Sequence, residues 1–230
     1  MNAASRFSDP AGGPAVKVDR HGTDMVAMEA AAIGVLDSLP HWFWDAVPPV
    51  PVERIAADHF GLLVRESEDP AKVPGAPAIP EGDHLSGFLL AKRGEIWVNA
   101  KDAREWPPRR RFTIAHELGH WVLHRDLGEV MCRAIDSPGE SQGDGQLVDS
   151  EGRPILARPE AEANAFAAAL LLPAKLIRES HSASGGDIDL IQERFNSSRA
   201  ALKRRFATLG LEFPPDPEGE ASPGSGSPST

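Results

Sequence analysis

Two histidines and a glutamate form the pattern H-E-x-x-H at His116, Glu117 and His120. A helix advances about 100° per residue, so His116 and His120 lie one turn apart on the same face. Two imidazole nitrogens at that spacing can bind one tetrahedral zinc ion. The carboxylate of Glu117 points to the side of the ion, where it can take a proton from a water molecule. The pattern predicts a zinc site with a general base beside it, and the alternative is a surface helix with two solvated histidines.

A catalytic zinc also needs a third protein ligand and an open position. The alanine-rich segment 159–173 has a helical pattern between two prolines and carries Glu160 and Asn164 on one face. We expect Glu160 to complete the zinc shell and Asn164 to bond the free ring nitrogen of a ligand histidine. Glu162 points about 200° away from Glu160 on a helical wheel, which makes it the poorer candidate. The alternative is that both glutamates only interact favourably with the helix dipole.

We expect one zinc ion per chain. Two histidines and one carboxylate can also hold manganese or iron, so the residues alone leave the identity of the metal open.

The apolar pattern predicts the elements that must position these residues. Helices are expected at 23–39, 52–60, 107–124, 160–172, 187–195 and 198–209, and strands at 62–64, 85–90 and 96–99. A long loop is expected at 133–157, where Gly, Asp and Ser are frequent. This order predicts an α+β domain, in which a small mixed or antiparallel sheet packs on the H-E-x-x-H helix.

The two ends of the chain differ from its middle. Residues 1–22 and 213–230 are rich in Gly, Pro and Ser and have little apolar periodicity. Such segments bury too little surface to offset the entropy of ordering, so we expect disordered tails. The remaining residues, 23–212, are expected to form one domain that includes a helical part at 187–211.

Charge and cysteine content indicate the surroundings of the protein. The formal net charge is −10 and the estimated pI is 5.3, which disfavours broad nucleic-acid binding. A single cysteine, Cys132, cannot form an intrachain disulfide, which suits a reducing compartment. The apolar stretch 25–39 is too short to span a bilayer, and the first 20 residues lack the apolar core of a signal peptide. We therefore expect a cytoplasmic protein without a membrane partner; its oligomeric state is not predicted.

The last two predicted helices resemble a helix-turn-helix in outline. Their basic residues are Arg194, Arg199, Lys203, Arg204 and Arg205. Because the whole chain is acidic, we do not expect direct DNA binding. Helices that cover the core, with a solvated basic face that could dock a protein substrate, are the favoured interpretation.

Two segments carry a resemblance to a known family. Residues 110–120 and 160–173 resemble the ImmA/IrrE family of metallo-endopeptidases. The strand 96–99 and the segment 130–133 are also similar, and the likeness covers about residues 50 to 211. Leu172 stands where this family more often has methionine.

The resemblance implies a zincin-like α+β domain with a gluzincin site. By position, His116, His120 and Glu160 match the family's metal ligands and Glu117 its catalytic glutamate. The implied substrate is a helix-turn-helix transcriptional repressor of the Xre type, which is cleaved to derepress genes of stress, mobile-element or toxin–antitoxin regulation. The rival function is a non-catalytic metal-binding module that sequesters a repressor or antitoxin. A general degradative protease is disfavoured, because unregulated proteolysis would harm a cell.

Three further expectations concern the surroundings of the site. A peptide would add to an exposed edge of the hairpin that ends at Val98 and Asn99. The chain has no tyrosine, so His124, His84, His181 or an arginine is left to stabilise an oxyanion. His124 lies about 80° around the helix from His116, so it cannot join the same ion, and we expect it to serve packing or the surface.

Overall fold

The computed structural model describes residues 23–77, 84–125, 130–135 and 157–214. The predicted tails, apart from Phe213 and Pro214, and most of the predicted loop at 133–157 lie outside these residues. The predicted domain limits therefore remain predictions. Within the described residues, helices and a small sheet form the α+β fold that the sequence indicated.

The helices agree with the predicted ones except for two additions, α3 and α6. The helices are α1 (Met25–Asp37), α2 (Val52–Arg54), α3 (Ala100–Glu105), α4 (Pro107–His124), α5 (Ala157–Leu171), α6 (Ala174–Ala183), α7 (Ile188–Phe195) and α8 (Arg199–Leu209). A π-helical turn, η1 (Ile55–His59), continues α2. The strands are β1 (Leu63–Ser67), β2 (His84–Leu90), β3 (Glu95–Asn99) and β4 (Val130–Ile135). The fourth strand begins before, and ends within, the segment predicted to be a loop.

The four strands form one mixed sheet in the order β1-β3-β2-β4. Strand β1 pairs parallel with β3, whereas β2 pairs antiparallel with both β3 and β4. The hairpin strands β2 and β3 are therefore interior strands, and β1 and β4 form the edges among the described residues.

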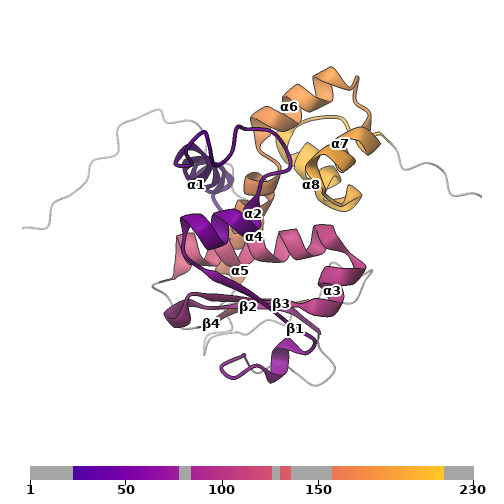
Figure 1. Cartoon of the computed structure of the whole chain (residues 1–230). Coiled ribbons are helices and arrows are strands. Elements are labelled where there is room, and N and C mark those ends of the chain that lie inside the picture. Colours follow the sequence, from indigo (N-terminus) through magenta and orange to yellow (C-terminus); the bar gives the residue numbers. More distant parts are fainter. Residues whose placement is uncertain (1–22, 78–83, 126–129, 136–156, 215–230) are drawn as a thin grey trace, which may run out of the picture.

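Side chains of β2 and β3 alternate between the two faces of the sheet, as expected for a sheet covered on both faces. Leu89, Ile96 and Val98 belong to the main core, beside α4. Leu85, Phe88 and Leu90 belong to a smaller cluster with Val73. Figure 1 shows α4 lying across the sheet, with α1 and α6 to α8 on the far side of α4.

Local sequence explains where the helices begin. The carboxylate of Asp24 accepts hydrogen bonds from two backbone N–H groups of α1, and Asp187 does the same for α7. The hydroxyl of Ser198 caps α8, which ends at Gly210 in the left-handed conformation. Helix α4 begins at Pro107, as predicted, because proline is tolerated in a first turn.

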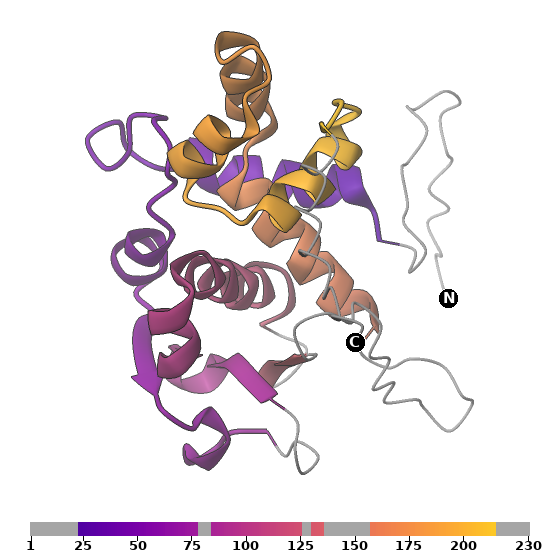
Figure 2. The ribbon, with the colours of Figure 1, turned by 90° about the vertical axis from the view of Figure 1, so that its right-hand side faces the viewer.

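Helix α5 connects the two layers of the domain. It packs against α4, α1 and α8, and Figure 2 shows it running obliquely from the side of α4 up to the C-terminal helices.

Arg205 of α8 does not belong to the predicted basic face, because its side chain is only 3% exposed. Its guanidinium donates to the carbonyl of Leu172 at 2.8 Å and to Glu29 of α1 at 2.7 Å. Arg205 thus ties the C-terminal helices to α1 and α5.

Candidate metal centre

Helix α4 places the two histidines of the motif side by side in the interior. His116 is 1% exposed and His120 is fully buried. Their Nε2 atoms lie 3.1 Å apart. Since the residues are one turn apart on one face of α4, both rings point to the same place, as predicted.

Helix α5 brings the carboxylate of Glu160 to the same place. Its Oε1 lies 3.1 Å from Nε2 of His120, and its Oε2 lies 3.2 Å from Nε2 of His116. The structure thus brings together the three residues that the sequence singled out as ligands. Within the described residues, these two histidines and this glutamate are close enough together to hold one metal ion.

Small residues at the crossing of the two helices allow this approach. A Cβ atom at Gly119 would lie 3.2 Å from the Cα and carbonyl oxygen of Ala163 and 3.1 Å from Cδ1 of Phe166. Such distances are tighter than ordinary van der Waals contact. The glycine between the histidines therefore sets how closely α5, and with it Glu160, can approach α4.

The three residues fit a tetrahedral zinc ion. Zinc binds imidazole nitrogen and carboxylate oxygen at about 2.0 to 2.2 Å, so neighbouring ligand atoms of a tetrahedral site lie roughly 3.3 Å apart. The separations of 3.1 to 3.2 Å are close to this value. Three protein ligands leave a fourth position for water or substrate, which is the pattern of catalytic rather than structural zinc.

The charge state of Glu160 also suits a ligand. Burial raises the pKa of this carboxyl group, but hydrogen bonds from His116 and His120 and the charges on their rings lower it more, to about 2. The carboxylate is therefore ionised at neutral pH. Its side chain is 27% exposed, so the group of ligands opens to solvent on the side of α5.

Each ligand histidine has a hydrogen bond on its other ring nitrogen. Nδ1 of His116 lies 3.1 Å from the side-chain oxygen of Asn164, one turn beyond Glu160 on α5. This is the contact predicted for Asn164. Nδ1 of His120 lies 3.2 Å from Nδ1 of His124.

His124 was expected to serve packing or the surface, and the structure shows more than that. Its ring is 4% exposed, and its Nε2 lies 2.9 Å from a carboxylate oxygen of Glu162. Neither residue belongs to the ligand group, as expected from the helix geometry. The sequence signal that could have revealed them is a third histidine at a further interval of four.

Glu117 lies on α4 between the two ligand histidines and is fully buried. Its position in the helix places it next to the ligand face, about 100° around from His116. A carboxyl group is thus placed in the interior, beside the group of candidate ligands.

The prediction for Val98 and Asn99 needs correction. They were expected at an exposed hairpin edge, but β3 pairs with β1 on one side and β2 on the other. Val98 is buried, and the side chain of Asn99 caps α3 and donates to the carbonyl of Leu85. The parallel pairing of β1 with β3 closes this edge.

Two of the histidines considered for the oxyanion have other contacts. Nε2 of His84 lies 2.8 Å from Asp102, and the ring of His181 packs edge-on against Phe206. These contacts do not single out an oxyanion donor among the candidates. The side chain of Cys132, the single cysteine, lies outside the described residues.

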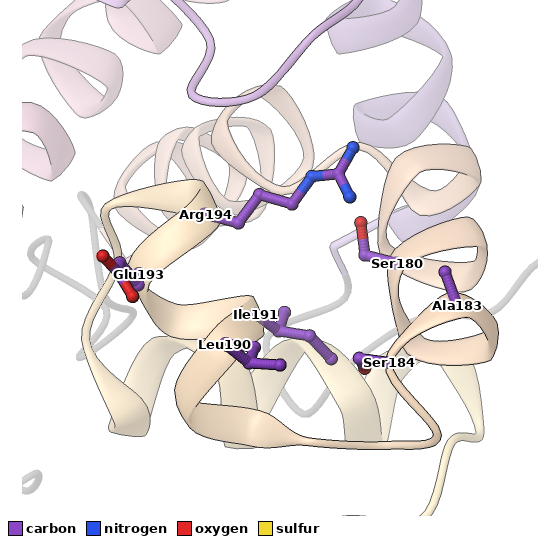
Figure 3. Close-up of a pocket in the computed structure, with 7 residues that line it drawn as sticks. All are labelled: Ser180, Ala183, Ser184, Leu190, Ile191, Glu193 and Arg194. Atoms are coloured by element: carbon purple, nitrogen blue, oxygen red, sulfur yellow. The ribbon is translucent and has the colours of Figure 1, made fainter.

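A hollow of about 480 Å³ lies between α6 and α7, away from the ligand group. Figure 3 shows Arg194 and Ser180 facing each other across its upper side, with Leu190 and Ile191 below. None of the candidate ligands lines it.

Comparison with known proteins places most of the chain in a peptidase family. Residues 58–207 match the family of M78 peptidases, with the matched region described as an IrrE N-terminal-like domain. Among solved structures, a transcriptional regulator from Mycobacterium tuberculosis is similar, with a TM-score of 0.50 and 18% identity over 83% of this chain and 49% of that chain. The chain thus spans about half the length of that protein, and at this identity the likeness shows the fold alone. Curated proteins give no significant match.

None of the helices in the described part of the chain combines the length and the apolar character needed to cross a membrane.

Proposed function

This chain belongs to the M78 peptidase family of IrrE N-terminal-like domains, and on that basis we propose that it is a zinc-dependent, site-specific endopeptidase. Membership of this family suggests a metallopeptidase-type role. The observation that carries the proposal is the buried meeting of His116 and His120 with the carboxylate of Glu160, with all contacts at 3.1 to 3.2 Å.

The ligand set favours zinc. His116 and His120 would hold it through Nε2 and Glu160 through its carboxylate, leaving one position open. When bound, the ion supplies Lewis acidity that polarises a peptide carbonyl and makes a water molecule acidic near neutral pH. Metal analysis would distinguish zinc from iron or manganese, which accept similar ligands.

Glu117 is proposed as the proton carrier of the reaction. It takes one proton from the water whose oxygen attacks the scissile carbonyl carbon. It then returns that proton to the departing nitrogen as the C–N bond breaks. Its burial suits this role, because a carboxylate shielded from bulk water holds its proton at the site between the two steps.

An extended peptide would bind by adding to the edge of β4. Among the described strands, β1 and β4 have a free edge, and β4 packs against the histidine-bearing helix α4. Backbone hydrogen bonds to an edge strand hold a peptide extended, as a protease requires. Single prolines along β4 should abolish cleavage while zinc is retained, whereas prolines along β1 should leave cleavage intact. The opposite pattern would place the substrate on β1.

The proposed substrate is an Xre-type helix-turn-helix repressor, as the resemblance to the ImmA/IrrE family implies. A DNA-binding repressor presents a basic surface. The net charge of −10 favours such a protein partner over DNA itself. Cleavage would remove the repressor from its operators and derepress stress, mobile-element or toxin–antitoxin genes in the cytoplasm.

The test is to mix the purified protein and zinc with the repressor encoded by the neighbouring gene. We expect two discrete fragments, no cleavage after chelation of zinc, and no cleavage by the Glu117→Gln variant. Casein should be left intact. A stable complex without any fragments would instead favour the rival function, sequestration of a repressor or antitoxin.

A further inference from the structure

Beyond the ligands, a histidine and a glutamate form a buried pair against His120. His124 follows one turn after His120 on α4, and Glu162 lies on α5 near Glu160. The ring of His124 is 4% exposed and the side chain of Glu162 is 13% exposed. The pair therefore has little contact with solvent, and its hydrogen bonds decide where its protons are.

The direction of these hydrogen bonds follows from their chemistry. Glu162 accepts from Arg158 at 2.8 Å through one oxygen, and its other oxygen lies 2.9 Å from Nε2 of His124. A carboxylate only accepts, so Nε2 of His124 donates. In a neutral ring the other nitrogen, Nδ1, then has a lone pair, which can accept from Nδ1–H of His120 at 3.2 Å.

The consequence concerns the nitrogen of His120 that faces the candidate metal. A neutral His120 that keeps its proton on Nδ1 has its lone pair on Nε2, the atom that lies 3.1 Å from both Glu160 and His116, and it can bind a metal ion there. Asn164 has the same effect on His116, because its side-chain oxygen accepts from Nδ1 of that ring at 3.1 Å. Each candidate ligand histidine thus has its own acceptor, which is Asn164 for His116 and His124 for His120. His124 in turn donates to the carboxylate of Glu162.

We propose that the pair His124 and Glu162 holds His120 in the tautomer and orientation that present Nε2 to the metal ion. His124 is a positioning residue in this role. The proposal rests on the metal site of the proposed function, but it does not depend on the substrate. Residues around metal ligands that fix tautomer and ring orientation change metal affinity by roughly 10- to 100-fold.

Substitutions at His124 separate this role from simple packing. His124→Phe keeps an aromatic ring but removes both nitrogens. His124→Gln loses the ring but supplies an amide oxygen that can accept from Nδ1 of His120, as Asn164 does for His116. If His124 only packs, phenylalanine should keep the zinc affinity better than glutamine does. If His124 positions His120, glutamine should keep the zinc affinity better. His181→Phe on α6 is the matched control, because its ring packs on Phe206 outside the ligand group.

The first measurement is zinc affinity, by competition with a chromophoric chelator. We expect His124→Phe to bind zinc roughly 10- to 100-fold more weakly, and His124→Gln and His181→Phe to remain near wild type. Glu162→Ala should weaken binding as well. Equal affinity of wild type, His124→Phe and Glu162→Ala would overturn the proposal. Circular dichroism verifies the fold, and if His124→Phe does not fold, the comparison of Glu162→Ala with Glu162→Gln decides, since only the alanine removes the acceptor.

The second measurement is the tautomer of His124, from long-range ¹H–¹⁵N NMR spectra of the zinc-free protein. We expect the proton of His124 on Nε2 in the wild type, where the carboxylate of Glu162 accepts it, and a mixture of tautomers in Glu162→Ala. A wild-type His124 with its only proton on Nδ1 would overturn the proposal. Failure of the wild type to bind zinc at all would count against the proposed function, while the tautomer would still decide this inference.

Discussion

Nε2 of His120 on α4 lies 3.1 Å from a carboxylate oxygen of Glu160 on α5. This contact joins two helices that a long stretch of sequence separates, and His116 completes the group from the same face of α4. The candidate site therefore depends on the packing of α5 against α4. Substitutions around this contact, and in the packing that produces it, should change metal binding and stability in specific ways.

Asn164→Ala should weaken zinc binding without removing the site. The side-chain oxygen of Asn164 orients His116 through Nδ1, and losing such a contact weakens metal binding by roughly 10- to 100-fold. Chelator competition measures the affinity, and Asn164→Asp, which keeps an acceptor oxygen, is the control. Unchanged affinity in Asn164→Ala would show that this hydrogen bond has no part in holding the metal.

Gly119→Ala should destabilise the domain and weaken zinc binding together. The added Cβ would lie within 3.2 Å of Ala163, so α5 must shift by a few tenths of an ångström. Overpacking of this kind costs about 1 to 3 kcal/mol. Thermal unfolding and zinc competition measure the two effects.

Gly34→Ala in α1 is the matched control for this prediction. A Cβ at Gly34 meets nothing within 4 Å, so alanine should stabilise that helix by about 0.5 to 1 kcal/mol. Equal behaviour of the two variants would mean that Gly119 is not required for the close approach of the helices.

Asp102→Asn should lower stability at neutral pH but much less in acid. Burial raises the pKa of Asp102, but hydrogen bonds from His84 and Ser86 and the charge of Arg109 lower it more, to a net value below 3.8. A carboxyl group whose folded pKa is lowered adds stability above its unfolded pKa and loses it as the pH falls through the folded value. We expect a loss of about 1 to 3 kcal/mol near pH 6.

Urea unfolding of wild type and variant at several pH values measures this effect. The difference in unfolding free energy should shrink as the pH falls below 3.8. Asp58→Asn is the control, because its carboxylate is 59% exposed and its loss should change the unfolding free energy little. A constant difference for Asp102→Asn down to about pH 2 would contradict the assignment of the effect to ionisation.

Arg205→Met should destabilise the domain strongly. It removes the buried guanidinium and leaves the carboxylate of Glu29 without that partner, which costs roughly 3 kcal/mol. Arg104→Met is the contrast, because its pair with Glu68 is exposed to solvent, so we expect little loss of stability. The double variant with Glu29→Met should recover much of the loss. Similar effects of the two single variants in urea unfolding would rule out a special role for the Arg205 pair.

The sequence predicted the grouping of the three candidate ligands better than their surroundings, and the reason is geometric. A spacing of four on one helix determines a shared face, so the pairs His116 with His120 and Glu160 with Asn164 follow from residue spacing alone. The contact of Glu162 with His124 depends on how α5 crosses α4, which a helical wheel does not describe. The wheel separated Glu162 from Glu160 correctly, but both side chains still reach α4 at different points along it.

Strand order was the other feature that local sequence does not determine. The apolar alternation of β2 and β3 predicted the hairpin, but the parallel pairing of β1 with β3 depends on the path of the chain after η1. The peptide edge was therefore placed wrongly at Val98 and Asn99. Two helices were also missed, although Asn99 caps α3 and Pro173 precedes α6, and both are ordinary signals of a helix start.

The most direct test of the metal centre is the zinc content of three proteins, measured by elemental analysis after dialysis against a low concentration of free zinc. Wild type and Glu162→Gln should each hold about one zinc ion per chain, whereas Glu160→Gln should hold almost none, since three protein ligands are needed to retain the ion. The two substitutions are chemically identical and two positions apart on the same helix. Equal zinc in Glu160→Gln and wild type would contradict a metal centre shared by α4 and α5.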